Sequence, residues 1–589
     1  MAIKKILWAV AFLLLLIILI GKPEEEKTEE LPDGTYENVY LISLKEEQMK
    51  VVVGGREWEL FCPLGENVEE SNRIVDITAE KNQISGIVWK EGQVSDQVEA
   101  VDSTKGVIRL KKYGTLPVEE TWKAYQVKEG EVETIKETGG LINWNEVDVI
   151  VIDGTVNAVI AKKEPEEKYI KVLIQGETGE THSSVRITAS KEFQTVIETE
   201  DGRRETKTFP AGEELTIQEE KSGEITCETG KIRILSVKRA AGYPEYRGKL
   251  MIRKEEQGYV IVNELLLEEY LYSVVSSEMP SSYPENALNA QAVCARTYAL
   301  YQRNRSYYSE FGANVDDSVN SQVYNNVAET KESQKAVKTT SEQYLEYENQ
   351  PIPAYFYSTS CGYTSDASDV WIGEGENPPY LKGHFQGEEE KERDLSSEKA
   401  FLAFLSEEQN CFEKEENWFR WKAEFPLEEL SARINERIEA LRKESPTHYL
   451  LKNGKEYVRQ EIPTMGMIKK MEVHERSTGG VIKELILEGE NASVKVIGEY
   501  QIRKLFCLEN GQFTLQDGSA VYSSMMPSGF FAMEMQGEGA ETKVVFTGGG
   551  YGHGVGLSQN GAKAMAKLKY GYEDILNFYY PDVTLVYGY

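Results

Sequence analysis

Short hydrophobic runs separated by turn residues fill the first part of the chain. Between residues 35 and 163, stretches such as YENVYLISL, MKVVVGG and DVIVIDGTVNAVIAKK alternate with Gly, Asn and Asp. β-branched and aromatic residues favour strands, whereas Gly, Asn and Asp favour the turns between them. The pattern predicts an all-β domain over 35–163, of small barrel or sandwich type. It holds no recognisable catalytic cluster, and we expect a scaffold or partner-binding role.

After residue 263, the spacing of apolar residues changes from every second residue, as in a strand, to the spacing of a helix. Strand-like runs such as YIKVLIQG and KIRILSVK follow a linker at 164–168. Apolar side chains then recur at helical spacing, with Asn263 as the expected N-cap; they are Leu266, Leu267, Tyr270, Leu271, Val274 and Val275. We therefore expect a mixed α/β region over 168–589.

Glu278 lies where this helix is expected to end. Pro280 disfavours helix at the preceding residue, so the helix should end near Ser276. Ser281 or Ser282 is the expected cap of a second helix, whose small residues predict close packing. Glu278 would then sit on a short, stiff turn between two helices.

Two later segments have their own patterns. Residues 385–460 contain SEKAFLAFLSEEQ and FPLEELSARINERIEALRKE, which predict a helix-rich insertion. Trp418 and Trp421 within it are expected to anchor a core. The segment FTGGGYGHGVGLSQNGAKAMA is glycine-rich, which permits close approach of another part of the chain, and a helix is expected over 559–568.

The amino terminus predicts a membrane anchor. Lys4 and Lys5 precede an uncharged apolar run at 6–20, which is followed by GKPEEEKTEE without a small-residue cleavage site. We expect an uncleaved signal anchor at 1–21 and a charged tether at 22–34; a cleaved signal peptide is the alternative. The positive-inside rule would keep both lysines in the cytoplasm, giving a single-pass protein of the cell membrane with its bulk on the extracytoplasmic side.

Charge and cysteine content narrow the class of protein. The 589 residues include 98 acidic and 66 basic side chains, a formal net charge of −32 that disfavours nucleic acid as a partner. This length predicts two to four domains. The six cysteines form no C-x-x-C pair, so free buried thiols are the expected state.

Few residues are candidates for chemistry. Glu278, fixed by its surroundings, is a candidate general acid, and His553 in the glycine-rich turn is a candidate site-lining residue. Cys361 with His553 or His384 is a weaker alternative, a thiol nucleophile and its base. Nucleotide binding is excluded because no phosphate-binding glycine motif is present.

Three separated blocks in order resemble the SpoIID/LytB family, the stage II sporulation protein D and amidase-enhancer proteins of Gram-positive bacteria. The blocks are NELLLEEYLYSVVSSEMPSSYPENALNAQAVCARTYAL, FYSTSCGYTSDASDVW and GYGHGVGLSQNGAKAMA, the last followed by ILNFYYP. The resemblance covers 168–589, with core motifs at 258–371 and 546–581. Residues 35–163 lie outside it. Together with the anchor and the all-β extension predicted above, the resemblance gives an α+β fold whose last part is a mixed α/β catalytic region with a helical insertion.

The resemblance implies a peptidoglycan lytic transglycosylase that acts on glycan strands stripped of stem peptides. Such an enzyme cleaves the bond between N-acetylmuramic acid (MurNAc) and N-acetylglucosamine (GlcNAc) and leaves 1,6-anhydroMurNAc ends. Glu278 matches the family's catalytic acid. The implied substrate-binding residues are Arg296, Gln291, Tyr298, Ser358, His553, Ser558 and Gln559.

Several expectations complete this hypothesis. Glu278 should have a raised pKa, and Arg296 should contact sugar rather than pair with Glu278. Some relatives carry a zinc site, but Tyr357 stands where a histidine would be needed, so we expect no metal and no cofactor. Partners would be glycan strands, a cell-wall amidase and the membrane. The alternative function is a non-catalytic, glycan-binding enhancer of that amidase.

Overall fold

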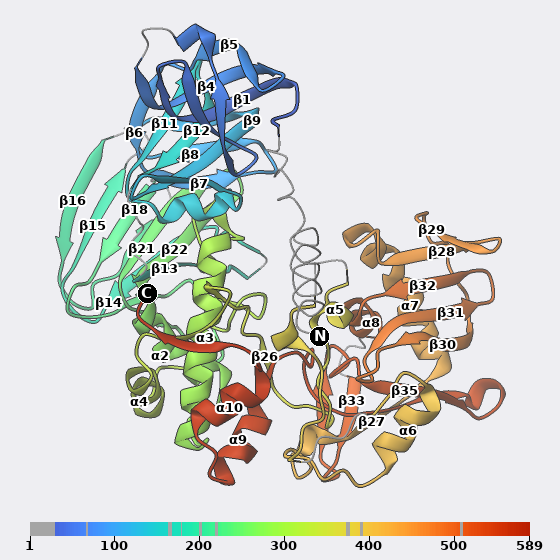
Figure 1. The fold of residues 1–589 in the computed structure, drawn as a ribbon. Helices are drawn as coiled ribbons and strands as arrows, with labels where there is room; N and C mark the ends of the chain where they lie inside the picture. Colours follow the sequence, from blue (N-terminus) through green and yellow to red (C-terminus); the bar gives the residue numbers. More distant parts are fainter. Residues whose placement is uncertain are drawn as a thin grey trace, which may run out of the picture. The chain divides into compact units, whose positions relative to one another are not determined.

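The computed structural model describes residues 30–65, 69–162, 168–177, 179–198, 203–217, 222–372, 377–388, 393–506 and 511–589. It is mixed α/β, with many strands and few helices (Figure 1). The chain divides into Met1–Glu166 and Glu167–Tyr589, called unit 1 and unit 2 here. The predicted anchor at 1–21 lies outside the described residues, and none of the helices within them is long and apolar enough to span a membrane.

Unit 1 consists of strands in its described residues, apart from two 3-10 turns at Pro63–Gly65 and Thr138–Asn143. Five strands close a barrel in the order β1-β2-β3-β5-β4, and seven form an open sheet in the order β6-β11-β12-β9-β8-β7 with β10 beside β9. The barrel strands are Gly34–Lys45, Gln48–Val53, Arg56–Phe61, Glu70–Glu80 (β4) and Gln83–Trp89 (β5). The sheet strands β6 to β12 are Gln93–Asp96, Val98–Asp102, Val107–Leu110, Gly114–Lys128, Glu131–Ile135, Val147–Ile152 and Thr155–Ala161. Each sheet has an apolar core, as the all-β pattern predicts.

Unit 2 begins with two sheets in the orders β16-β15-β18-β21-β22-β13-β23 and β17-β14-β19-β20. Strands β13 to β18 are Tyr169–Leu173, Val185–Ala189, Phe193–Glu198, Arg204–Phe209, Leu215–Ile217 and Ser222–Thr226. Strands β19 to β23 are Ile232–Ile234, Glu245–Tyr246, Lys249–Glu255, Gly258–Leu266 and Val315–Asp316. The chain passes directly from β22 into the helices that carry the candidate site.

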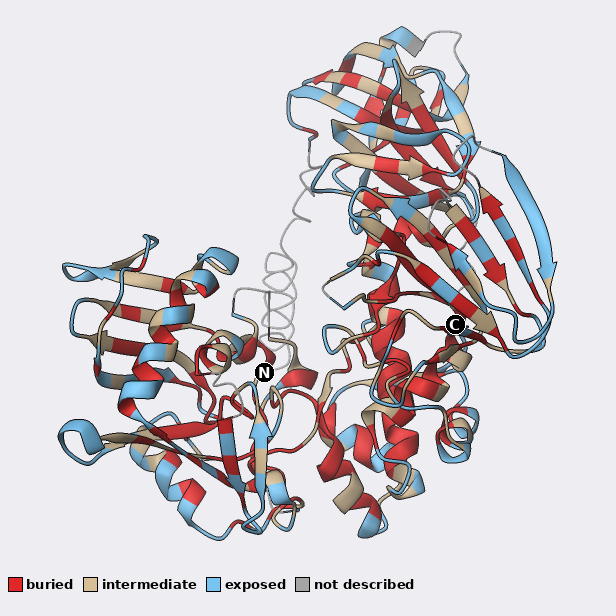
Figure 2. Ribbon diagram, turned by 180° about the vertical axis from the view of Figure 1, so that it is seen from behind, coloured by how far each residue is buried: buried red, intermediate tan, exposed pale blue. Residues whose placement is uncertain are grey.

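The helix α3 (Glu285–Arg305) is the centre of this region and is buried along most of its length (Figure 2). Its small residues Ala287, Ala290, Cys294 and Ala295 are each inaccessible to solvent, which confirms the predicted close packing. It contacts α2, α4, α9 and α10. These helices are Leu267–Glu278 (α2), Lys331–Thr339 (α4), Gln559–Lys567 (α9) and Tyr572–Tyr579 (α10).

Short strands join the middle of unit 2 to its carboxy-terminal part. Strand β26 (Phe356–Tyr357) runs parallel to β37 (Leu557–Ser558), and β24 (Gln343–Tyr347) pairs with both β25 (Gln350–Pro351) and β38 (Thr584–Tyr587). The glycine-rich segment therefore lies beside the residues near 356, although about 200 positions separate them in sequence. The sequence motifs alone contained no sign of this pairing.

The region between these strands is a mixed α/β insertion. Within 385–460, both segments predicted to be helical form helices, at Glu398–Ser406 and Leu427–Glu444, and the later residues are mainly strands. Two five-stranded sheets run in the orders β34-β33-β27-β36-β35 and β29-β28-β32-β31-β30. Strands β27 to β32 are Trp421–Pro426, Tyr449–Asn453, Glu456–Val458, Ile468–Arg476, Ile482–Gly489 and Ser493–Ile497, and β33 to β36 are Gly511–Leu515, Ala520–Ser523, Phe531–Gln536 and Lys543–Gly548. The helices are Ala367–Val370 (α5), Glu398–Ser406 (α6), Leu427–Glu444 (α7) and Glu499–Leu505 (α8).

The tryptophans of the insertion behave differently from each other. Trp421 is fully buried, as predicted, and begins strand β27, whose alternating buried and exposed residues have a period of two. Trp418 is only partly buried and packs against the Tyr551 ring at 4.6 Å between centroids. The helical periodicity of the flanking segments hid the strand between them.

Both predicted caps are wrong, and one helix ends two residues later than predicted. Asn263 lies in β22, where its Nδ2 donates to the carbonyls of Arg247 and Lys249, so it caps no helix. Helix α2 starts at Leu267 and runs on to Glu278, two residues beyond the predicted end. Helix α3 follows Pro284 without a side-chain cap, so neither predicted serine has that role. At Asn263, tertiary hydrogen bonds took precedence over the local capping preference.

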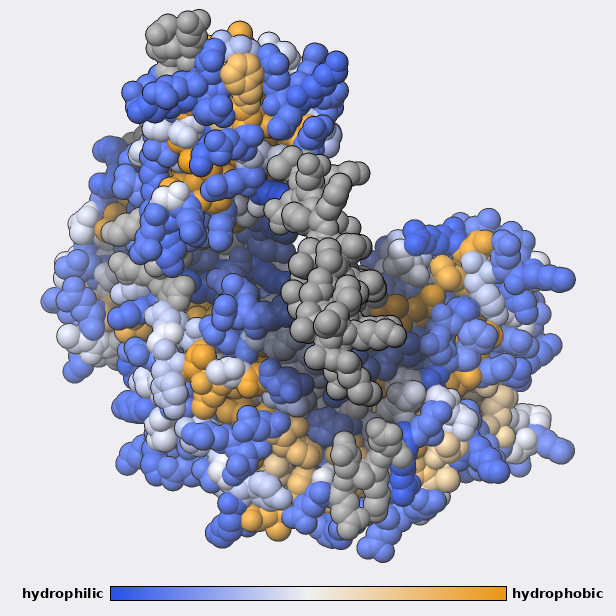
Figure 3. Space-filling view, viewed as in Figure 1, coloured by the Kyte–Doolittle hydropathy of each residue, from blue (hydrophilic) through white to orange (hydrophobic). Residues whose placement is uncertain are grey.

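The surface agrees with the composition. The face seen in Figure 3 is mainly hydrophilic, with hydrophobic residues in small separate patches.

The five described cysteines, Cys62, Cys227, Cys294, Cys361 and Cys411, are free and buried, which confirms the expectation for those residues.

Candidate active site

Glu278 is the last residue of α2 and is half-buried. Its Oε1 accepts a hydrogen bond from the backbone N–H of Val323 at 2.7 Å. Its carboxyl group also bonds with the Gln559 side chain. Loss of solvation raises the pKa of Glu278 to about 7, although these two hydrogen bonds act in the opposite direction. A carboxyl with this pKa is half-protonated near neutral pH, which suits a general acid.

Three of the predicted site residues meet here, each from a different helix. Gln559 begins α9 and donates from Nε2 to Oε1 of Gln291 on α3 at 3.5 Å. Gln291 is fully buried, and its Nε2 has no hydrogen-bond partner among the described residues. Glu278, Gln559 and Gln291 thus form one polar cluster with an unused amide donor. Buried amide donors without a partner are uncommon and costly in folded proteins.

The loop after β23 supplies the Val323 N–H and is tied down on both sides. Asp317 accepts two hydrogen bonds from the Arg239 guanidinium, at 2.6 and 3.2 Å. Gln322 donates from Nε2 to the carbonyl of Ala295 on α3 at 3.2 Å. Ser277, next to Glu278, accepts from the N–H of Val327 at 3.1 Å. These bonds fix the donor that faces the carboxyl, and the sequence motifs gave no sign of it.

His553 has a fixed tautomer and is partly exposed. Its Nε2 donates to the carbonyl of Phe356 at 3.0 Å, and its Nδ1 accepts from the N–H of Val555 at 3.1 Å. Desolvation lowers the pKa of His553 to about 4, so the ring is neutral near pH 7. The ring lies 5.3 Å from that of Trp371 and 5.5 Å from that of Tyr357. His553 therefore holds the glycine-rich turn against β26 and donates no proton to a substrate.

Ser358 and Ser558 mainly join segments of the chain. The Ser558 hydroxyl caps α9 by accepting from the N–H of Gly561 at 3.3 Å. The carbonyl of Ser358 accepts from the N–H of Asn560 at 2.9 Å. Ser558 is fully buried, whereas Ser358 is partly exposed. These bonds set where α9 begins and so where Gln559 lies.

Glu413 is a second carboxyl with a raised pKa, and the sequence analysis did not single it out. It is fully buried, and it accepts hydrogen bonds from the Ser360 N–H at 2.9 Å and from the hydroxyls of Ser360 and Ser558. Desolvation raises the pKa of Glu413 to about 7. Its segment, NCFEKEENW, is one of many charged stretches in the chain. Glu413 links the insertion to the cap of α9.

Arg296 lies in a different environment from the one expected. Its side chain is fully buried, and it donates from Nε and Nη2 to the two carboxylate oxygens of Glu268 at 2.6 and 2.9 Å. The other donors reach the carbonyls of Ala292, Val337 and Gln343 and the Thr340 hydroxyl. All five N–H groups are used within the protein, so none is left for a sugar. The guanidinium joins α2, α3 and α4.

Tyr298 is also mainly internal. Its hydroxyl accepts from Nε2 of Gln302 at 2.6 Å, and its ring lies 5.8 Å from that of Tyr355. Only 6% of the residue is exposed. Tyr298 therefore supports the aromatic group near His553 from behind, with little surface for a ligand.

The thiol alternative has no support from the surroundings of Cys361. The side chain is fully buried, and desolvation raises its pKa to about 11, so it is a neutral thiol near pH 7. His384 packs edge-on against the Phe578 ring at 4.9 Å. Within the described residues, no group of three or more His, Cys, Asp or Glu side chains could hold a metal ion.

Comparison with known proteins matches the region that carries this cluster. Residues 255–347 match the family described as Stage II sporulation protein, and residues 365–556 match a domain of unknown function, DUF8618. The chain is 28% identical to the stage II sporulation protein D of Bacillus subtilis (strain 168) over 338 residues, which is 55% of this chain and 75% of that protein.

In two further relatives, the matched region is a smaller share of the relative's own length. The amidase enhancer of Bacillus subtilis (strain 168) is 27% identical over 329 residues, 54% of this chain and 40% of that protein. The stage II sporulation protein D of Bacillus amyloliquefaciens is 38% identical over 135 residues, 20% of this chain and 38% of that protein. These matches confirm the resemblance predicted from the three sequence blocks.

Proposed function

From the resemblance to the SpoIID/LytB family, which the comparisons bear out, we propose that the chain is a peptidoglycan lytic transglycosylase whose single acid–base group is Glu278. Its substrate would be the glycan strand after an amidase has removed the stem peptides. The observation that carries the proposal is the position of Glu278, half-buried beside Gln559 with a pKa of about 7.

One carboxyl group is enough for this reaction. Protonated Glu278 gives its proton to the oxygen that links MurNAc to GlcNAc, and the C1–O bond breaks. The resulting carboxylate then removes the proton from the C6 hydroxyl of MurNAc, whose oxygen bonds to C1 and closes the 1,6-anhydro ring. The proton returns to Glu278. A hydrolase needs a second carboxylate to activate water or form a covalent intermediate, but here the nucleophile is part of the substrate.

The neighbours of Glu278 suit both halves of this cycle. Desolvation favours the protonated acid of the first step, while the Val323 N–H and the Gln559 amide stabilise the carboxylate of the second. Gln291 accepts from Nε2 of Gln559 and so holds that amide in place beside the carboxyl. Arg296, by contrast, pairs with Glu268 and so leaves the pKa of Glu278 raised.

A test is mass spectrometry of products from purified, peptide-free glycan strands. We expect wild type to release fragments with 1,6-anhydroMurNAc ends and Glu278→Gln to release them about 10²–10⁴-fold more slowly, the usual contribution of a general acid. Glu285→Gln, which replaces an exposed carboxylate at the start of α3, is the matched control. Anhydro products formed by Glu278→Gln at the wild-type rate would contradict the assignment.

The second candidate is a non-catalytic, glycan-binding enhancer of an amidase, and the relative named amidase enhancer favours it. The same preparation separates the two functions. Stimulation of a cell-wall amidase without any anhydro product from wild type would support the enhancer. Stimulation that survives in Glu278→Gln while the product is lost would mean that one chain does both.

The location of the protein is also a proposal. The apolar run at 6–20 would anchor the chain in the cell membrane and place both units on the extracytoplasmic side, where the glycan is. Membrane fractionation of cells expressing the full chain, compared with a chain starting at residue 22, tests it. Equal recovery of both in the soluble fraction would contradict the anchor.

A further inference from the structure

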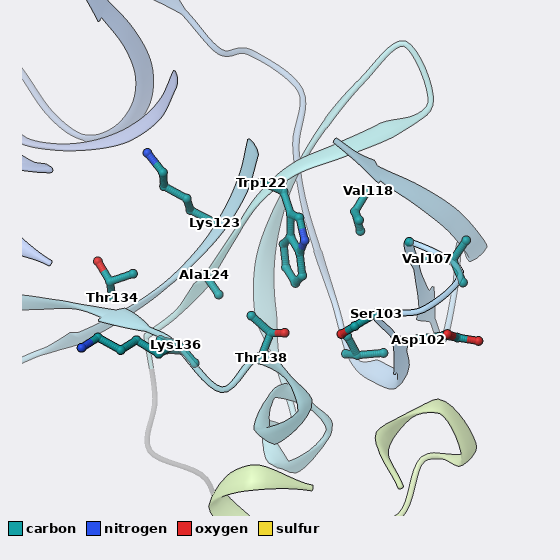
Figure 4. Close-up of a pocket in the computed structure, with 13 residues that line it drawn as sticks. Asp102, Ser103, Val107, Val118, Trp122, Lys123, Ala124, Thr134, Lys136 and Thr138 are labelled. Carbon is teal, nitrogen blue, oxygen red and sulfur yellow. The ribbon is translucent and has the colours of Figure 1, made fainter. Parts of the chain in front are cut away.

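We infer that unit 1 binds an uncharged sugar ring in a pocket on its open sheet. The pocket has a volume of about 240 Å³ and is formed by β7, β8, β9 and the segment from β10 to residue 138 (Figure 4). All of its lining residues belong to unit 1, and none of them belongs to the cluster around Glu278. Its volume is below the roughly 300–1,000 Å³ of sites for drug-sized ligands, which suits one ring rather than a long ligand.

Trp122 gives the pocket an aromatic wall. The indole lies between Val118 and Thr138 in Figure 4, and the residue is half-buried against the core of the sheet. A pyranose ring has a face of C–H groups and a rim of hydroxyls, so it can cover an indole while its hydroxyls remain available. Tryptophan combines a large apolar surface with one N–H donor, which matches such a ligand.

Hydrogen-bonding groups stand around the indole without protein partners. Among the described residues, neither the Nε1 of Trp122 nor the hydroxyls of Ser103 and Thr138 bond to another protein group. The two hydroxyls lie on the same side of the indole in Figure 4. Each hydroxyl can donate and accept, as sugar hydroxyls can, so the set suits a ligand with several hydroxyl groups.

The charges at the pocket are turned away from its centre or neutralised, which disfavours an anionic ligand. The amines of Lys123 and Lys136 extend away from the indole in Figure 4. Lys123 donates from Nζ to the carbonyl of Glu37 at 2.6 Å. Asp102 accepts from the N–H of Lys105 at 2.9 Å and pairs with its Nζ at 3.1 Å. Phosphate sites need free donors of positive charge, and this pocket offers none at its centre.

The test uses the full chain with 5-fluorotryptophan at its eight Trp positions, in the Glu278→Gln background so that no glycan is consumed. The fluorine signal lost in Trp122→Phe identifies Trp122. We expect that signal to move saturably with chitotriose, a trimer of GlcNAc, while the signal of Trp89 in the barrel stays in place. Because the readout belongs to one residue, it holds whether or not Glu278 proves to be catalytic.

A pocket variant that keeps Trp122 checks the polar contacts. Ser103→Ala with Thr138→Val should weaken chitotriose binding about tenfold. Without ligand, the Trp122 signal of this variant should have the same chemical shift as in the parent protein, which shows that the pocket remains folded. A Trp122 signal that does not move with chitotriose or with cellotriose at millimolar concentrations would overturn the inference. So would a signal that moves only with inorganic phosphate, because the pocket would then be an anion site.

Discussion

Glu278 and Glu413 are two carboxyls of unit 2 with the same raised pKa and different surroundings. Both have a pKa of about 7 because burial disfavours the charged form. Glu278 is half-buried, with one backbone donor and one amide beside it. Glu413 is fully buried, and its oxygens already accept from Ser360 and Ser558. A perturbed pKa therefore does not identify a catalytic acid; access and an unfilled hydrogen-bonding capacity are needed as well.

The two carboxyls are also connected. Glu413 holds the hydroxyl of Ser558, Ser558 caps α9, and the first residue of α9 is Gln559, which bonds with Glu278. The insertion thus reaches Glu278 through one cap. Under the proposed function, Glu413 would be a positioning residue and Glu278 the group that meets substrate.

The largest expected difference between the two sites is in stability. Glu413→Ala should lower the free energy of unfolding by about 2–4 kcal/mol, because it leaves the buried donors of Ser360 and Ser558 without an acceptor. Glu278→Ala should lower it by less than about 1 kcal/mol, since a half-buried acid leaves fewer unsatisfied groups. Chemical denaturation measures both, with the exposed neighbour Glu415→Ala as the control. Equal losses of unfolding free energy in Glu413→Ala and Glu278→Ala would contradict the structural role assigned to Glu413 alone.

The next effect is on the pH dependence of glycan cleavage. The first step needs protonated Glu278, so the rate should fall as the pH rises through about 7, approaching tenfold per pH unit above it. In Glu413→Gln, the rate should fall over the same pH range, which is the falling limb of the pH profile, although the rate itself is lower at every pH. A limb that shifts or disappears in Glu413→Gln would mean that Glu413, not Glu278, controls the profile.

A smaller effect is expected where the two sites are joined. Ser558→Ala removes the cap of α9 and a donor to Glu413, which should cost about 1–2 kcal/mol of stability. We also expect glycan cleavage to fall severalfold because Gln559 loses its fixed position. Ser358→Ala, which keeps the backbone carbonyl that holds Asn560, is the comparison variant. Unchanged cleavage in Ser558→Ala would show that the cap does not position Gln559.

The smallest effect concerns the amide beside Glu278. Gln559 lowers the pKa of Glu278 by stabilising its charged form, so Gln559→Ala should raise that pKa. The falling limb of the pH profile should then move to higher pH by up to about one unit. Lys567→Ala, an exposed residue at the other end of α9, should leave the limb in place. A shift to lower pH in Gln559→Ala would contradict the contact.

The sequence predicted the parts of the candidate site that lie within short motifs. The motifs and the family resemblance identified Glu278, Gln291 and Gln559. Gln291 and Gln559 lie in helices as predicted, and Glu278, predicted on the turn after the first helix, is the last residue of that helix. The prediction failed where a contact depends on distant segments. Asn263 looked like a cap but lies in a sheet, and Arg296 looked like a ligand-binding residue but pairs with Glu268. An asparagine can cap a helix or hydrogen-bond within a sheet, and an arginine can bind a ligand or pair with a distant carboxylate. The sequence does not distinguish these roles.

The sequence by itself determined the strand periodicity of unit 1, the small-residue surface of α3 and the resemblance to the SpoIID/LytB family, because these depend on local spacing and on ordered motifs. Only the tertiary structure decided that the Val323 N–H faces Glu278 and that Glu413 reaches Ser558. Those contacts join residues 45 and 145 positions apart. Solvation and hydrogen bonding at a carboxyl depend on every atom around it, and most of those atoms come from elsewhere in the chain.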